Sequence, residues 1–218
     1  MEEYKDFISF IEESIKKNWD LDALTDYEGS TLQYKDVARK IEKLHILFEN
    51  AGVKKGDKIA LCGRNSANWS VAFMATLAYG AVVVPILHEF KAEQVHNIVN
   101  HSEAKILFAG DVVWPTLNAN EMPHLEGIIH IPDYSLLVSR TEQLTEAREH
   151  LNEFFGRKYP KFFRKPFSRV SVLFSNFYKP FRNCHFIHLP SMTPLYLCRT
   201  RLSTIILPEM SKIFFEKC

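Results

Sequence analysis

The densest group of metal-ligating side chains lies near the C-terminal end of the 218-residue chain. Cys184, His185 and His188 fall within five residues, and Cys198 follows ten residues after His188. Thiolates and imidazole nitrogens are the ligands that zinc prefers in proteins. The group lacks the paired Cys-x-x-Cys of structural zinc sites, which favours a chance grouping. We therefore predict no metal site.

Histidines in the first half of the chain are the other candidates for chemistry. His96 and His101 are five residues apart, off the four-residue spacing that puts two ligands on one helix face, so we expect both at the surface. His88 follows a predicted strand, and ligands of open α/β sheets bind beyond the carboxyl ends of strands. Because no Ser-His-Asp or paired-carboxylate arrangement can be argued from spacing, the sequence predicts no catalytic residue.

The composition is that of a folded globular protein. Hydrophobic residues make up 46% and charged residues 24%, with a net charge of +1, which excludes a wholly disordered chain, collagen and a coiled coil. Four cysteines are too few for a disulfide framework, which indicates a reducing compartment. The acidic N-terminus has neither the basic nor the apolar region of a signal peptide, so we predict a cytoplasmic protein.

The charge and glycine content divide the chain near residue 160. Residues 1–160 hold 17 basic and 24 acidic side chains, whereas residues 161–218 hold 10 basic and two acidic ones. All eight glycines precede residue 157, while nine of the seventeen phenylalanines and five of the ten prolines follow residue 160. We predict an N-terminal α/β unit over 1–160. The segment 161–218 is predicted to be an irregular, basic, Phe- and Pro-rich tail, with a shifted reading frame as one hypothesis for its origin.

Strands and helices alternate through the first 160 residues. Short apolar runs predict strands at 58–63, 81–86, 105–109 and 127–131, and three- and four-residue apolar spacing predicts helices at 4–17, 36–50, 66–79, 92–101 and 142–154. The uncharged run 65–87 has the length of a membrane span, but Gly80 and Pro85 interrupt it. This alternation indicates a mainly parallel sheet with helices on both faces, and we expect helix 66–79 to be largely buried.

Several blocks, in this order, resemble the opening of the adenylate-forming (AMP-binding) enzymes. The blocks are Thr31 to Val37, Gly52 to Ala60, Asn65 to Trp69 and Leu77 to Ile86, and the segment Glu93 to Phe108 fits the same template. The resemblance covers residues 18 to about 135 and is nearest to the long-chain fatty acid–CoA ligases. It implies the N-terminal sheet subdomain of such an enzyme.

The resemblance also implies a reaction and its ligands. The intact enzymes join a fatty acid or other carboxylate to ATP with Mg²⁺, and coenzyme A then displaces AMP. The turn that carries His88 lies near the thiol and acyl tunnel in this family, so His88 is the one candidate for lining that tunnel. Trp69 and Cys62 are interpreted instead as core residues, Cys62 as an inert buried thiol.

The phosphate-binding part of the family pattern has no counterpart in the chain. The family's Gly-rich phosphate loop should follow soon after residue 165, yet no glycine follows Gly156. We therefore expect an inactive N-terminal part that binds none of these cofactors by itself. The alternative is a non-catalytic module whose basic tail engages a partner, an anionic membrane surface or nucleic acid. Of these, nucleic acid is not expected and peripheral membrane association stays open.

Overall fold

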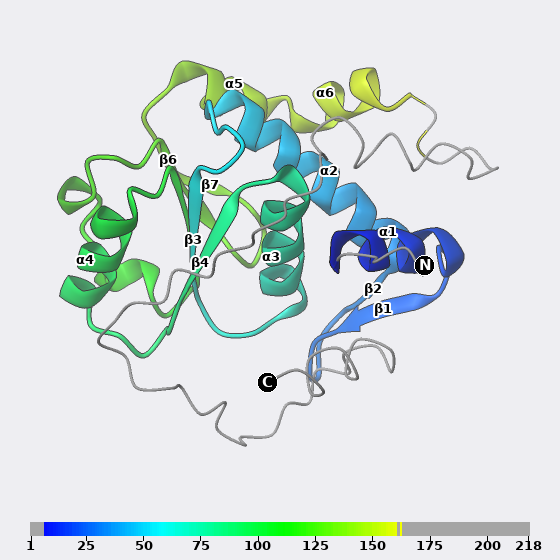
Figure 1. Ribbon diagram of the computed structural model, residues 1–218, viewed down its shortest axis with the longest axis horizontal. Coiled ribbons are helices and arrows are strands. Elements are labelled where there is room, and N and C mark those ends of the chain that lie inside the picture. The colour runs from blue at the N-terminus through cyan, green and yellow to red at the C-terminus, as the bar shows by residue number, and fades with distance from the viewer. Residues whose placement is uncertain (1–6, 161, 163–218) are drawn as a thin grey trace, which may run out of the picture.

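A computed structural model describes residues 7–160 and 162 of the chain. The predicted tail, the Cys/His group at 184–198 included, lies outside the described residues apart from Phe162. The first elements are helix α1 (Phe7–Lys17), the antiparallel hairpin β1 (Asp22–Thr25) and β2 (Thr31–Gln33), and helix α2 (Tyr34–Asn50). They lie together on one side of the molecule (Figure 1).

A five-stranded sheet forms the centre of the described region. In chain order it contains β3 (Lys58–Cys62), β4 (Val82–Ile86), β5 (Ile106–Ala109), β6 (Gly127–His130) and β7 (Leu136–Ser139). The strand order is β4-β3-β5-β6-β7, in which the first four strands are parallel and β7 is antiparallel to β6. The four predicted strands therefore lie in one sheet, as expected. Strand β7 was not predicted.

Helices cover both faces of this sheet. Helix α4 (Ala92–Ser102) lies on one face, and α3 (Ala67–Tyr79) lies on the other with α2 packed over it (Figure 1). Successive residues of a strand therefore belong to different hydrophobic clusters, one on each face of the sheet. Ile59 and Leu61 of β3 belong to the cluster with α2 and α3, whereas Ala60 and Cys62 belong to the cluster with α4. Burial on both faces explains why the central strands β3 and β5 are apolar without alternation.

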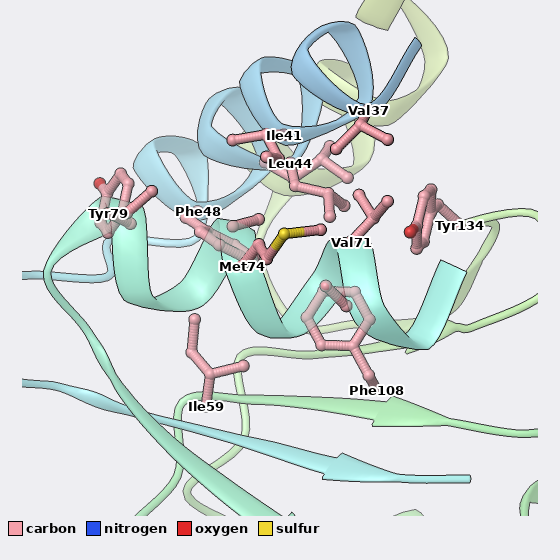
Figure 2. Packing of buried hydrophobic residues seen from close by; sticks show 14 of the residues in the cluster. Val37, Ile41, Leu44, Phe48, Ile59, Val71, Met74, Tyr79, Phe108 and Tyr134 are labelled. Atoms are coloured by element: carbon pink, nitrogen blue, oxygen red, sulfur yellow. The ribbon is translucent and has the colours of Figure 1, made fainter. Parts of the chain in front are cut away.

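Helix α3 is the central element of the larger cluster. Its N-cap Ser66 accepts a hydrogen bond from the Trp69 N–H through its side chain, and Gly80 ends it in the left-handed conformation at φ 83°. Val71 and Ala75 are fully buried between α2 and the sheet (Figure 2 shows Val71 there). The helix is thus largely buried, as predicted. No helix among the described residues is long and apolar enough to span a membrane.

One predicted helix near the end of the α/β unit needs correction. The predicted helix 142–154 is two helices, α5 (Glu142–Glu149) and α6 (Leu151–Lys158), which meet at His150. Apolar periodicity continues through the junction, so the pattern alone gives no stop signal there. The short 3₁₀ turns Trp114–Thr116 and Ala119–Glu121 lie between β5 and β6.

Candidate functional site at the carboxyl edge of the sheet

The carboxyl ends of the parallel strands gather polar residues from four separate parts of the sequence. Beyond the strand ends lie Arg64 after β3, His88 after β4, Asp111 after β5 and Asp133 after β6. In open α/β sheets this edge is where ligands bind, because the loops that follow the strands converge there. It is the candidate functional site of the described region.

Two glycines bring the backbones of β3 and β5 together at this edge. A Cβ placed on Gly110 would lie 3.0 Å from the Gly63 Cα atom, and one placed on Gly63 would lie 2.6 Å from Ile131 Cδ1 and 3.3 Å from the Gly110 Cα atom. The N–H of Gly110 donates to the Cys62 carbonyl oxygen at 2.9 Å. The backbone segments at Gly63 and Gly110 are therefore in close contact, and they form the base of the candidate site, called its floor below.

His130 lies between two carboxylates at the end of β6. Its Nε2 is 3.4 Å from Asp111 Oδ1 and its Nδ1 is 3.1 Å from Asp133 Oδ1. The Ser135 N–H and hydroxyl also donate to Asp133, at 3.0 and 2.8 Å. Although burial opposes its charged form, these hydrogen bonds from Ser135 and His130 lower the pKa of Asp133. The sequence analysis did not predict this group of three residues. The one sequence feature that could have indicated it is that each residue ends or follows a strand.

The candidate tunnel residue His88 lies at the other side of the sheet edge. It is half-buried in the turn after β4, and no hydrogen bond or ion pair joins it to another described residue. Strand β4 is three strand spacings from β6, or about 14 Å. The structure thus does not bring His88 together with His130, and its role in an acyl tunnel stays a prediction.

The remaining sequence-based assignments divide between core and surface. Cys62 is fully buried, as expected from its strand, and burial raises the pKa of its thiol to about 12. Trp69 is only half-buried and stacks on Phe73 with ring centroids 5.5 Å apart. It is therefore a core-edge residue. Within residues 7–160 and 162, no group of three or more Cys, His, Asp or Glu side chains could hold a metal ion.

His96 is not the surface residue that its spacing suggested, whereas His101 is exposed. Only 5% of His96 is exposed, because its ring lies beneath the segment between β5 and β6. Its Nδ1 is 2.8 Å from Glu121 Oε2, and its Nε2 accepts a hydrogen bond from the Asn118 N–H at 3.1 Å. His96 therefore fastens the loop 110–126 to α4. The loop's path could not be read from the helix pattern.

Residues 11–164 match the family described as "AMP-binding enzyme". The chain belongs to this family. The adenylate-forming resemblance noted from the sequence blocks is thereby confirmed, and the α/β fold is that of the ligases' N-terminal region.

Curated relatives of this AMP-binding chain are acyl-activating ligases. A putative acyl–CoA ligase of Bacillus subtilis is 36% identical over 80 residues, which are 37% of this chain and 16% of the relative. A long-chain-fatty-acid–CoA ligase of Mycobacterium bovis is 30% identical over 115 residues, which are 51% of this chain and 19% of the relative. The matched part therefore spans less than a fifth of either relative.

Solved ligase structures show the same fold. An anthranilate–CoA ligase in complex with anthranoyl-AMP superposes with a TM-score of 0.56 at 20% identity, covering 66% of this chain and 27% of that chain. Coronafacic acid ligase from Pectobacterium brasiliense superposes with a TM-score of 0.55 at 19% identity, covering 65% and 29%. At these identities the likeness concerns the fold alone.

Proposed function

We propose that this chain supplies the N-terminal α/β subdomain of an acyl–CoA ligase acting on a long-chain fatty acid. The observation that carries the proposal is the family match over residues 11–164, together with the 30% identity to a long-chain-fatty-acid–CoA ligase. The parallel sheet, with its converging carboxyl edge, is the part of the proposed enzyme that the described residues provide.

The proposed reaction has two steps. A carboxylate oxygen of the fatty acid attacks the α-phosphorus of ATP, a C(O)–O–P bond forms, and pyrophosphate leaves. The sulfur of coenzyme A then attacks the acyl carbon, a thioester forms, and AMP leaves. Both steps need phosphate-binding groups, since negative charge develops on the phosphoryl oxygens.

The described residues do not fit a magnesium site. Mg²⁺ takes carboxylate oxygens, substrate phosphates and water in octahedral geometry. Asp111 and Asp133 are the carboxylates at the edge, and both face the His130 ring in ion-pair geometry. We assign no step to a metal held by this chain. Its proposed contribution is the floor of the site and, through His88, one wall of the acyl and thiol tunnel.

Exchange of pyrophosphate into ATP tests whether the chain alone performs the first step. We expect the full 218-residue chain, given ATP, Mg²⁺ and a panel of fatty acids, to exchange at the rate without enzyme, because its sequence has no Gly-rich loop after Gly156 to hold phosphate. Robust exchange would show that the chain does hold a phosphate-binding site and would overturn the expected inactivity.

A chimeric enzyme tests the positive part of the proposal. In the Mycobacterium bovis ligase, the segment that matches this chain is replaced by the corresponding residues of this chain. Acyl–CoA formation is then measured on chimeras whose circular dichroism spectrum is native-like. We expect activity to be retained. In that chimera, His88→Ala should change KM for the fatty acid or coenzyme A, while His101→Ala, an exposed control on α4, should not. A folded chimera that forms no acyl-adenylate would refute the proposal.

A further inference from the structure

A cavity lies where α2 meets α5, the start of α6 and the turn after β6, and Asp133 at the sheet edge forms part of its wall. Its volume is about 280 Å³. Four cationic side chains line it, Arg39, Lys40 and Lys43 from α2 and Arg148 from α5. They are called here the basic pocket. Two acidic side chains, Asp133 and Glu149, also line the cavity, so positive charge is in excess.

Three of the four cations form no salt bridge with a carboxylate among residues 7–160 and 162, although the Asp36 charge acts on Lys40 from a greater distance. Lys40 Nζ lies 5.2 Å from the centroid of the Tyr134 ring. Lys43 Nζ donates to the neutral Asn152 Oδ1 at 2.6 Å. Arg148 Nε donates to the Tyr134 carbonyl oxygen at 2.7 Å, which leaves its two Nη groups as donors without a described acceptor. Arg39 pairs with Asp36 at 3.0 Å.

The gathered charges disfavour one another. Burial, and then the charge of Arg39, lower the pKa of Lys40. Burial, followed by the charges of Arg39, Lys40 and Arg148, lowers the pKa of Lys43. A bound anion would offset this repulsion, because each lysine would then face an opposite charge.

The pocket is held in place by Tyr134, which has an uncommon backbone conformation. Its φ is 55°, in the left-handed region that a bulky residue rarely adopts. The surroundings fix it there, since its hydroxyl donates to the Asn68 carbonyl oxygen at 2.7 Å and its N–H donates to the His130 carbonyl oxygen at 2.9 Å. Its ring and carbonyl oxygen position Lys40 and Arg148, so the arrangement of the cations is preorganised.

We propose that the basic pocket binds a phosphate monoester. Several lysine and arginine donors converging on one cavity suit a ligand group with several oxygens and two negative charges, and the guanidinium fork suits bidentate contact with phosphate. Asp133 and Glu149 on the wall disfavour a larger polyanion. The volume, just below the 300 Å³ at which drug-sized sites begin, fits a phosphate with a small substituent. This inference does not rest on the proposed ligase activity.

Thermal unfolding of the full chain with added anions tests the proposal. Inorganic phosphate and a small phosphate monoester, glycerol 3-phosphate, are compared with chloride at equal ionic strength, and the two phosphate arms distinguish free phosphate from a monoester. At about 100 times the dissociation constant, we expect the unfolding midpoint to rise by roughly 5–10 °C. Phosphate also raises midpoints by exclusion from the surface, so matched variants are needed.

The matched variants are Lys43→Gln in the pocket and Lys54→Gln on an exposed loop, which change the net charge equally. We expect Lys43→Gln to weaken phosphate binding, measured by calorimetry, about tenfold or more. Lys54→Gln and Lys43→Arg should leave the dissociation constant for phosphate within about threefold of the parent value. Removing one charge from a repelling group should not unfold the chain, which the midpoint in chloride verifies. The proposal fails if chloride matches phosphate, or if Lys43→Gln and Lys54→Gln weaken binding equally.

Discussion

A hydrogen bond between Tyr159 and Glu42 holds the end of α6 against α2, across 117 residues of sequence. Glu42 is 1% exposed. The Tyr159 hydroxyl donates to its Oε2, and the next polar group is His45 Nδ1 at 3.8 Å from the same oxygen. The other oxygen, Oε1, has no partner among the described residues. Burial and then the Glu42 charge raise the pKa of the Tyr159 hydroxyl, so it remains a donor throughout the physiological range.

The change Tyr159→Phe removes this donor and little else. A buried acceptor left without its donor costs about 1–3 kcal/mol. In a domain of this size about 1 kcal/mol corresponds to roughly 2–4 °C, so we expect the unfolding midpoint to fall by roughly 2–12 °C. The measurement is thermal unfolding followed by circular dichroism, with chemical denaturation to supply the free energy of unfolding.

Tyr27→Phe is the matched control, because Tyr27 is 72% exposed and the same hydroxyl is removed there. We expect its midpoint to stay within about 1 °C of the parent. In a double-mutant cycle with Glu42→Gln, the two changes should be strongly non-additive, since both act on one hydrogen bond. A Tyr159→Phe midpoint equal to that of the control would refute the anchoring of α6 through Glu42.

Three further predictions concern the sheet edge, the basic pocket and the boundary of the α/β unit. Gly110→Ala should lower the free energy of unfolding by about 1–3 kcal/mol, measured by urea denaturation, because its Cβ would meet the Gly63 backbone at 3.0 Å. Lys40 and Lys43 have lowered pKa values in the folded chain, so just below pH 10.5 the unfolded chain binds more protons than the folded one. The free energy of unfolding of the parent should therefore rise with pH in this range, relative to that of a Lys40→Gln/Lys43→Gln variant. A difference between the two proteins that does not change with pH would contradict the lowered lysine pKa values. Truncation after Phe162, which keeps its ring packed 5.4 Å from that of Trp19, should move the midpoint by no more than roughly 2–4 °C, and a fall of ten degrees would show that residues beyond 162 belong to the core.

Local patterns predicted most of the secondary structure. The strand predicted at 81–86 begins one residue later, and that predicted at 58–63 ends one residue earlier. Helix α3 was predicted with a cap at Ser66 or Asn65 and a stop at Gly80, and the structure has Ser66 as the cap. These signals are short-range, because apolar runs, caps and glycine stops act within a few residues of where they are written.

The errors fall where distant contacts override the local pattern. Strand β7 is short and half-buried along its whole length, so neither alternation nor a continuous apolar run marks it, and its pairing with β6 makes it a strand. His96 is buried because the segment that carries Asn118 and Glu121 lies over it. Spacing along α4 carries no information about that covering segment.

The sequence by itself determined the family, the parallel α/β fold and the placing of His88 beyond a strand end, since those follow from ordered local blocks. Only the tertiary structure decided the strand order, the Asp111–His130–Asp133 trio and the basic pocket. Arg148 reaches Lys43 from more than a hundred residues away, through the packing of α5 on α2. Charges so far apart in the chain influence one another only when folding brings them within a few ångströms, because water and salt screen them otherwise.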